Sequence, residues 1–358
     1  MRIVTADDGA ISLHGMEDWM DERRLGDGPL AEIRAIGGGT QNQVVRFRRG
    51  DTEYVLRAGP RRPRPSSTEA IRREARVVGA LGRTEIRVPA LVAADDDLGG
   101  ERPFYLMRPV AGVLLPESLD HFDAHPTAKR RAGLAMVEWL AELAAIDHSA
   151  LGLHDFGRPD GFRERQVARW SGQLAGYAQT GTYDGPGIDL EPLEEWLVAH
   201  VPPHGPVGIL HGDFHLNNVL LRSDGEVAAV VDWELATIGD PLLDLGHLLV
   251  TWPSGDDSSI GMVPADRADG LATPAELVAR YEERTGQQVD HLAWYAALAG
   301  YRMGVILEGT RARALDGRAS PEMGELLHGV ALVLWRGALA RIGHPNQQGS
   351  TKEVHHVG

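Results

Sequence analysis

The chain has 358 residues, of which 43% are hydrophobic and 24% are charged, and its 51 acidic and 36 basic residues give a formal net charge of −15. This composition is typical of an ordinary soluble globular protein with about two domains or lobes. The negative charge disfavours nucleic acids and anionic membranes as partners, and the absence of cysteine excludes disulfides and thiolate metal sites.

The first part of the chain has the pattern of antiparallel strands with one short helix. Residues 12–25 suit a short, mostly polar helix. The segments at 44–47 (VVRF) and 53–57 (EYVLR) are rich in β-branched and aromatic residues, and residues 49–51 (RGD) supply a tight turn between them. These segments therefore predict a β-hairpin.

A glycine triplet lies directly before this hairpin. In IGGGTQNQVVRF, the residues Gly37, Gly38, Gly39 and Thr40 could let backbone amides approach an anion, because glycine has no Cβ to interfere. No Gly-Lys-Ser/Thr follows, so the segment is not a P-loop. Its position favours a phosphate-covering loop, and a flexible turn is the alternative.

One helix and two more strands complete the first part of the chain. Ser66 followed by Glu69 fits a helix start with a capping box. Glu74 lies on the apolar face of this helix, where an unpaired charge would be costly. Two further strands are predicted at 90–97 and 103–110.

From about residue 127 the pattern becomes helical, apart from one β-rich island at 207–233. Apolar residues at helical spacing predict helices at 128–148, 161–178, 190–200, 274–285, 290–307 and 321–341. A small β lobe joined to a large helical lobe predicts an α+β fold with a cleft between the lobes.

The island carries a crowded polar motif, HGDFHLNNVLL, at 211–221. Apolar segments on both sides predict short strands, so the polar residues form a loop, and the following strand pair returns Asp232 to the same end. Asp213, Asn218 and Asp232 are then expected to converge. Two carboxylates and an amide oxygen suit Mg²⁺ better than zinc. The alternative is that these residues only cap turns.

The spacing from His211-Gly212-Asp213 to Asn218 matches the protein-kinase catalytic loop, H-R-D-x-x-x-x-N. With glycine in place of arginine, DWE at 232–234 in place of D-F-G, and ATIGDPLLDLGHLL downstream, the chain resembles the aminoglycoside phosphotransferase family of small-molecule kinases. The resemblance covers nearly the whole chain, and YVLRAGP at 54–60 resembles the branch associated with acyl-CoA dehydrogenases. It implies a bilobal, protein-kinase-like fold.

The resemblance also implies roles for the residues of the motif. Asp213 would orient the acceptor hydroxyl and accept its proton, and Asn218 and Asp232 would hold Mg²⁺ against the phosphates of ATP. His211 would brace the loop. Asp240 and Asp244 are expected to hold local backbone or a helix start, and His215 to be a loop histidine.

On the nucleotide side, the resemblance places the glycine-rich segment over the phosphates and Met107, Arg108 and Val110 at a hinge where backbone groups meet adenine. Arg57 stands where the family usually has a lysine. Arginine is a planar fork rather than a point charge, but both can bind phosphate oxygens. We therefore expect Arg57 to be the phosphate-binding cation, paired with Glu74.

These observations predict three regions: a nucleotide-binding lobe at 1–110 that includes the N-terminal helix and ends in the hinge, a helical catalytic and acceptor-binding lobe at 111–345, and a flexible tail at 346–358. The expected function is ATP- and Mg²⁺-dependent phosphoryl transfer to a hydroxylated small molecule, either aminoglycoside-like or of the hydroxyacyl/CoA type. We see no signal peptide and no run of about 18 apolar residues, so we expect a cytoplasmic protein without nucleic-acid or membrane partners. The oligomeric state stays open.

Two alternatives come from other classes of protein. A pseudokinase would bind nucleotide without turnover, which the replacement of lysine by Arg57 favours and the intact motif disfavours. A metallohydrolase would use His211, Asp213 and His215, which alternate along the sequence and would share one face of a continuous strand.

Overall fold

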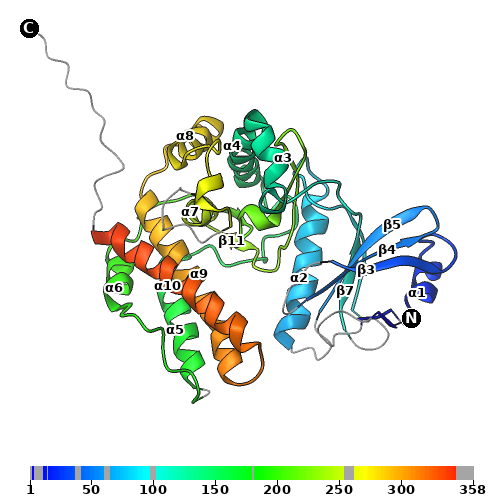
Figure 1. Ribbon diagram of the computed structural model, residues 1–358, viewed down its shortest axis with the longest axis horizontal. Helices are drawn as coiled ribbons and strands as arrows, with labels where there is room; N and C mark the ends of the chain where they lie inside the picture. Colours follow the sequence, from blue (N-terminus) through cyan, green and yellow to red (C-terminus); the bar gives the residue numbers. More distant parts are fainter. Residues whose placement is uncertain are drawn as a thin grey trace, which may run out of the picture.

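The β-sheet lies at one end of the molecule and a larger group of helices makes up the rest (Figure 1). The computed structural model describes residues 2–3, 11–13, 15–36, 42–59, 65–96, 102–179, 181–253 and 262–343. The predicted phosphate loop, Gly37 to Thr40, and the predicted tail at 346–358 lie outside these ranges. The prediction of an α+β fold, with a small antiparallel β lobe and a larger helical lobe, is confirmed.

The β lobe is built on a five-stranded antiparallel sheet with the order β3-β4-β5-β7-β6. The predicted hairpin is formed by β4 and β5, which pair in one unbroken register. Alternating side chains of these two strands pack against the short helix α1 in a core of their own. The strands and this helix are β3 (Leu30–Ala35), β4 (Gln43–Arg49), β5 (Thr52–Ala58), β6 (Leu91–Asp95), β7 (Phe104–Met107) and α1 (Met16–Glu22), preceded by the two-residue strands β1 (Arg2–Ile3) and β2 (Ile11–Ser12).

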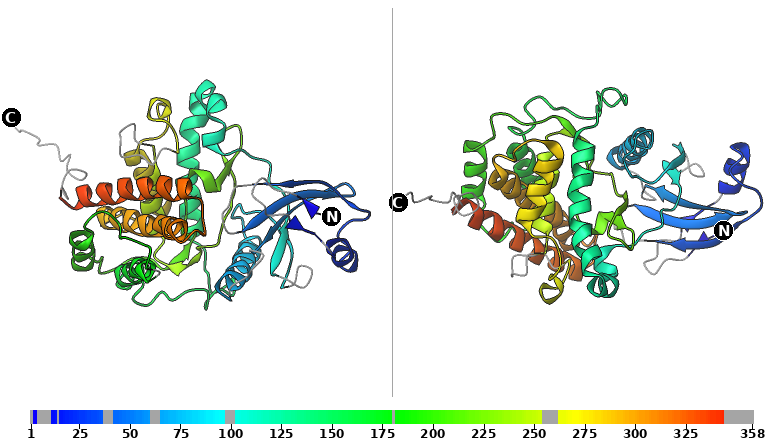
Figure 2. Two further views of the ribbon diagram at one scale, coloured as in Figure 1. Left: turned by 60° about the horizontal axis from the view of Figure 1, so that its bottom comes forward. Right: turned by 90° about the horizontal axis from the view of Figure 1, so that it is seen from above.

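Helix α2 (Pro65–Leu81) connects the two lobes. Its residue Ile71 packs against Tyr105 of the sheet, whereas Val78 and Leu81 belong to the core of the helical lobe. The helix therefore contributes to both cores, although the sequence assigned it to the first lobe alone. Figure 2 shows it between the sheet and the helices in both views.

The helical lobe has one continuous apolar core, which Trp139 and Phe214 occupy with stacked rings 5.4 Å apart. Two of its helices, α3 and α7, were not predicted, α5 begins later than expected, and α9 runs beyond the predicted end. The helices are α3 (Leu119–Ala124), α4 (Pro126–Ala144), α5 (Gln166–Ala178), α6 (Glu191–Ala199), α7 (Leu242–Thr251), α8 (Pro274–Thr285), α9 (Leu292–Leu315) and α10 (Pro321–Gly343), with 3₁₀ turns at Leu115–Glu117, Leu216–Asn218 and Ala265–Arg267.

Two short antiparallel strand pairs lie within this lobe. The pair β9 (Val219–Leu221) and β10 (Val227–Val230) is the strand pair that was predicted to return Asp232 toward the polar motif. The pair β8 (Gly208–Leu210) and β11 (Thr237–Gly239) includes a strand that was not predicted. The polar motif connects β8 to β9, and the segment containing Asp232 connects β10 to β11. The two strand pairs thus bring the two polar segments together.

Helix α10 is the one described helix that is long and apolar enough to cross a membrane by length and composition. It packs along α9, with Leu334 and Trp335 buried, and Figures 1 and 2 show the two helices side by side. A core helix passes the same test, so this feature is weak evidence for a membrane span.

Candidate active site

The polar motif begins as a sharply turned loop that a neighbouring helix holds. Gly212 has φ +84°, and a Cβ there would clash with the backbone of Leu235, so the position requires glycine. The carboxylate of Asp244, on α7, accepts the backbone N–H groups of His211 (2.6 Å) and Gly212 (2.8 Å). Burial raises the pKa of Asp244 to about 6, against the lowering effect of these two bonds. Asp244 therefore holds local backbone, as predicted.

His211 is a structural residue of this loop. It is fully buried, its Nδ1 accepts the backbone N–H of Asp213 (3.2 Å), and its Nε2 lies 2.9 Å from the carbonyl oxygen of Val231. Burial lowers the pKa of His211, which keeps the ring neutral. Both ring nitrogens are thus occupied by hydrogen bonds. His211 therefore cannot be a metal ligand in this structure, which contradicts the metallohydrolase alternative of His211, Asp213 and His215.

Asp213 and Asn218 lie together at the ends of this loop. Nδ2 of Asn218 donates to the carbonyl oxygen of Asp213 (2.8 Å) and to its Oδ2 (3.1 Å). These bonds turn the amide oxygen of Asn218 away from Asp213. Burial opposes ionisation of Asp213, but its hydrogen bond with His215 and the neighbouring histidines lower its pKa, so the carboxyl is ionised at neutral pH.

Asp232 follows β10 with φ +66°, in the left-handed region that aspartate tolerates better than most residues. Its Oδ1 accepts a hydrogen bond from Nη2 of Arg57, on β5 (2.7 Å). The backbone N–H of Val231, the residue before it, donates to the carbonyl oxygen of Asn218 (2.9 Å). The structure therefore brings Asp232 next to the Asn218 segment, as the sequence predicted, and next to Arg57, a contact that was not predicted.

Arg57 and Glu74 form the predicted ion pair. Nε of Arg57 donates to Oε2 of Glu74 (2.7 Å), and Oε1 of Glu74 accepts the backbone N–H of Trp233 (3.1 Å). Burial raises the pKa of Glu74 to about 7, while the charge of Arg57 works in the opposite direction. Through Glu74, helix α2 is connected both to the cation and to the backbone beside Asp232.

These residues line one cavity of about 510 Å³ between the lobes. Arg57, Asn218 and Asp232 lie on its wall, together with all three predicted hinge residues, Met107, Arg108 and Val110. The backbone N–H of Arg108 donates to Ala90 (2.9 Å), and its guanidinium lies over the ring of Tyr54. The Arg108 amide is therefore already paired, and the prediction that this segment offers backbone groups to adenine is left to its other backbone groups.

The predicted glycine loop cannot be placed, because Gly37, Gly38, Gly39 and Thr40 lie outside the described residues. The residues that flank this loop, Ile36 and Asn42, both line the cavity. Nδ2 of Asn42 donates to Oε2 of Glu234 (2.8 Å), in the DWE segment.

Two side chains around the site, Glu234 and His247, were not singled out from the sequence, whereas Arg302 was a candidate for the acceptor side. Glu234 lies 3.4 Å from Nη2 of Arg57, so the cation faces three carboxylates. Arg302, on α9, donates through Nη2 to the carbonyl oxygen of Gly212. His247, on α7, lies one helical turn after Asp244, and that spacing was the signal that could have placed it on the same face.

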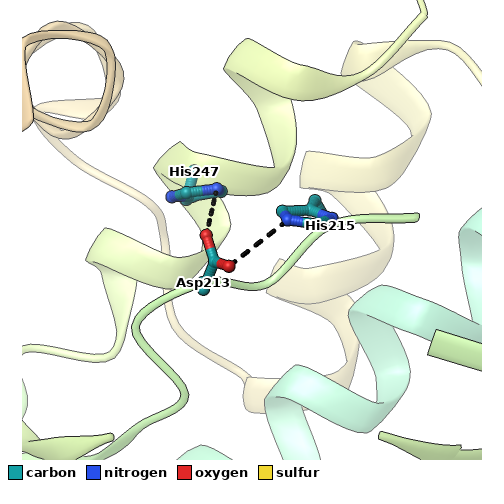
Figure 3. Close-up of side chains that lie close together, drawn as sticks. All are labelled: Asp213, His215 and His247. Atoms are coloured by element: carbon teal, nitrogen blue, oxygen red, sulfur yellow. Dashed lines mark ion pairs between the residues drawn. The ribbon is translucent and has the colours of Figure 1, made fainter. Parts of the chain in front are cut away.

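His247 and His215 face the two oxygens of Asp213 (Figure 3). Nε2 of His215 lies 3.4 Å from Oδ2 and Nε2 of His247 lies 3.5 Å from Oδ1. His247 is 1% exposed, and burial lowers its pKa to about 3, so it is neutral. The site thus has a buried cation on the wall of the cavity, carboxylate and amide groups beside it, and an ionised aspartate between two imidazoles.

Comparison with known proteins points to one kind of chemistry. A family model described as "Phosphotransferase enzyme family" matches residues 32–298. Acyl-CoA dehydrogenase family member 10 of Mus musculus is 31% identical over 320 residues, covering 86% of this chain and 29% of that protein. Family member 11 of Homo sapiens is 31% identical over 301 residues, covering 82% and 37%. The chain thus spans about a third of the length of these curated relatives.

Solved structures agree with this picture. A putative aminoglycoside phosphotransferase from Ralstonia eutropha JMP134 has a TM-score of 0.73 and 28% identity, covering 92% of this chain and 98% of that one. The ternary complex of the aminoglycoside phosphotransferase APH(4)-Ia with AMP-PNP and hygromycin B has a TM-score of 0.58 and 18% identity, covering 90% and 98%, which shows a common fold. Both kinds of comparison agree with the resemblance found in the motifs.

Proposed function

Because the chain belongs to the phosphotransferase enzyme family, we propose that it transfers the γ-phosphoryl group of ATP, with Mg²⁺, to a hydroxyl group of a small molecule. The observation that carries this proposal is the meeting of Arg57, Asp232 and Asn218 on the wall of one cavity, with Asp213 hydrogen-bonded to Asn218. A cation for phosphate, oxygen ligands for a metal and an ionised carboxylate are the parts that this chemistry needs.

The residues on the nucleotide side fit a magnesium nucleotide. The carboxylate of Asp232 and the amide oxygen of Asn218 are hard donors of the kind that Mg²⁺ prefers. When bound, Mg²⁺ would neutralise charge that develops on the phosphate oxygens. Arg57 would exchange its bond to Asp232 for the α- and β-phosphate oxygens, while Glu74 keeps its side chain extended.

Asp213 would act on the acceptor. Its lowered pKa keeps the carboxylate charged, so it can accept a hydrogen bond from the acceptor hydroxyl and orient that oxygen for in-line attack. Two hydrogen bonds from Nδ2 of Asn218 hold Asp213 in place, one to its carbonyl oxygen and one to its side chain. The proton of the hydroxyl would pass to this carboxylate as the new phosphate ester bond forms.

For the acceptor we propose a hydroxyacyl compound, either a CoA thioester or its free acid, rather than an aminoglycoside. The groups around Asp213 on the helical lobe are the imidazoles of His215 and His247 and the guanidinium of Arg302. A polycationic aminoglycoside needs clustered carboxylates. The relatives that carry an acyl-CoA dehydrogenase name support an acyl compound.

The test is ADP release from Mg·ATP over a panel of acceptors, with Asp213→Asn as the control for chemistry. The panel holds hydroxyacyl-CoA thioesters, their free acids, aminoglycosides, amino alcohols and sugars. We expect turnover with the hydroxyacyl compounds that the variant loses while it still binds nucleotide. Turnover with aminoglycosides alone would overturn the acceptor class, and nucleotide binding without turnover on any acceptor would favour a pseudokinase.

A further inference from the structure

The cluster around Asp213 contains an unexplained histidine. Only 1% of His247 is exposed, and neither Nδ1 nor Nε2 has a hydrogen-bond partner among the described residues. Burying a polar ring without partners is unfavourable, so such a group calls for an explanation such as a water or an ion. At 3.5 Å from Oδ1 of Asp213, Nε2 of His247 is too far for a good hydrogen bond.

We propose that Asp213, His215 and His247 form a second metal site, for Zn²⁺ or a similar transition-metal ion, distinct from the magnesium ligands Asn218 and Asp232. One ligand atom from each residue lies within 4.8 Å of the others. Figure 3 shows the two rings turned toward the carboxylate from the loop and from α7.

The nitrogen-to-oxygen spacings are close to those of a zinc site. A tetrahedral ion with ligands at about 2.0–2.1 Å holds neighbouring ligand atoms about 3.4 Å apart. Nε2 of His215 lies 3.4 Å from Oδ2 of Asp213 and Nε2 of His247 lies 3.5 Å from Oδ1, so binding one ion requires the carboxylate and the two rings to close on it by small rotations. Two imidazoles and one carboxylate, with a fourth position open, are a common zinc donor set and a poor one for Mg²⁺.

The protonation states are also those that a metal requires. Asp213 is ionised and His247 is neutral, so neither must lose a proton for an ion to bind. His215 must change tautomer, because its Nδ1 now accepts the backbone N–H of Asn217 at 3.2 Å. That exchange gives up this contact at the start of a single 3₁₀ turn, and an ion at Nε2 would also displace Nδ2 of Asn218, which lies 3.4 Å away.

Occupation of this site would inhibit phosphoryl transfer. The inhibition, though not the binding, rests on the proposed function, because the metal takes the carboxylate that would orient the acceptor hydroxyl. Zn²⁺ should therefore compete with the acceptor and not with Mg·ATP, since the nucleotide side has its own oxygen ligands.

The first experiment measures binding without turnover. Zn²⁺ is titrated calorimetrically into the chelator-treated full chain in excess Mg²⁺, and Co²⁺ is used to read out tetrahedral coordination from its visible absorption. We expect a specific site that His247→Gln weakens by at least about tenfold. If that variant does not fold by circular dichroism, His215→Gln serves the same purpose. Absence of Zn²⁺ binding, or unchanged binding in a folded variant, would overturn the proposal.

Two controls separate this site from other histidines of the chain. His204→Gln removes an exposed histidine away from the cluster, and His355→Gln with His356→Gln removes the histidine pair near the C-terminus of the sequence. The Zn²⁺ affinity should be unchanged in both. A loss in either would assign the bound metal elsewhere and overturn the proposal.

The second experiment measures ADP release with increasing Zn²⁺. Inhibition that a higher acceptor concentration relieves supports the site, and inhibition that only Mg·ATP relieves would assign Zn²⁺ to the nucleotide side and overturn it. If no acceptor supports turnover, the proposed function fails, while the calorimetric result still decides the metal site.

Discussion

At the scale of single residues, Arg57 shows why an arginine can serve where related kinases usually carry lysine. Its planar fork reaches Glu74 through Nε and Asp232 through Nη2, both at 2.7 Å. A lysine ammonium is a single point charge on a flexible stem and cannot hold two carboxylates in this fixed geometry. The arginine therefore makes a connection between the lobes that a lysine could not make in the same geometry.

Arg57→Met should reduce both stability and activity. It leaves Glu74 buried without its partner, which costs about 3–5 kcal/mol of unfolding free energy. Adding Glu74→Gln removes the buried charge, so the double variant should recover part of the stability but not nucleotide binding. Urea unfolding and ADP release measure the two effects separately. A single variant with wild-type turnover would contradict the role of Arg57.

Asp244 makes stability depend on pH. Its folded pKa of about 6 lies above the unfolded value of 3.8, so the folded protein binds the proton more tightly, and this contribution to the unfolding free energy falls as pH rises through that range. The variant Asp244→Asn lacks this pH-dependent contribution, and its side chain leaves one of the two backbone N–H groups without an acceptor. We expect the variant to be less stable at low pH and the gap to narrow by about 1 kcal/mol between about pH 5 and about pH 7.5.

Urea unfolding of wild type and variant at several pH values measures that gap. Parallel stability curves for the two proteins would show that the Asp244 carboxyl does not titrate in this range.

Which site residues the sequence could predict depended on whether they lie within one motif. Asp213 and Asn218 are separated by a spacing that the loop itself imposes, and they meet in the structure. His247 and Arg302 approach the same loop from α7 and α9, and only the packing of those helices brings them there. For His247 the only local signal is its spacing of one helical turn from Asp244, which itself holds the loop.

At the scale of elements, the same distinction explains which strands and helices were predicted. β9 and β10 are neighbours in the sequence and read as a hairpin, whereas β11 has three residues and pairs with β8, a distant segment. Helix α7 is apolar on nearly all sides because it is buried on nearly all sides, so it lacks the periodicity that reveals an amphipathic helix.

The packing of α7 on α9 should depend on Gly246. A Cβ at this position would lie 2.7 Å from the backbone carbonyl of Tyr295, which cannot move without shifting α9. Gly246→Ala should therefore lower the unfolding free energy by about 1–3 kcal/mol. It should also lower turnover, because α7 carries Asp244 and His247.

The matched control is Gly172→Ala, in the exposed middle of α5, where a Cβ meets nothing within 4 Å. There alanine should stabilise the protein by up to about 1 kcal/mol through its helix propensity. Chemical unfolding of both variants tests the pair. Equal effects at the two positions would mean that the close approach of α7 and α9 is not what disfavours a side chain at residue 246.

At the scale of the whole molecule, the two predicted lobes are less separate than the sequence suggested. Helix α2 contributes to both cores, and its Arg73 donates to the carbonyl oxygen of Phe156 in the helical lobe (2.6 Å). Glu74, on the same helix, holds Arg57 of the sheet and the backbone of Trp233. The proposed nucleotide site is therefore made from both lobes and from the helix between them.

Binding at such a site should stabilise the whole chain. Mg·ATP at about a hundred times its dissociation constant adds about 2.7 kcal/mol to the unfolding free energy, and ATP with a chelator should add less. Asp232→Asn should abolish that difference, because the amide offers the metal no charge, while asparagine tolerates the positive φ of this position as well as aspartate does. Thermal unfolding with and without Mg²⁺ measures it.

Asp224→Asn, in the exposed turn between β9 and β10, is the matched control and should keep the full dependence on Mg²⁺. If Asp232→Asn also keeps it, the metal is held by other groups. If the variant instead loses stabilisation by ATP both with and without Mg²⁺, the Arg57–Asp232 contact itself prepares the phosphate site. The two outcomes distinguish an Asp232 that binds the metal from an Asp232 that only positions the guanidinium of Arg57.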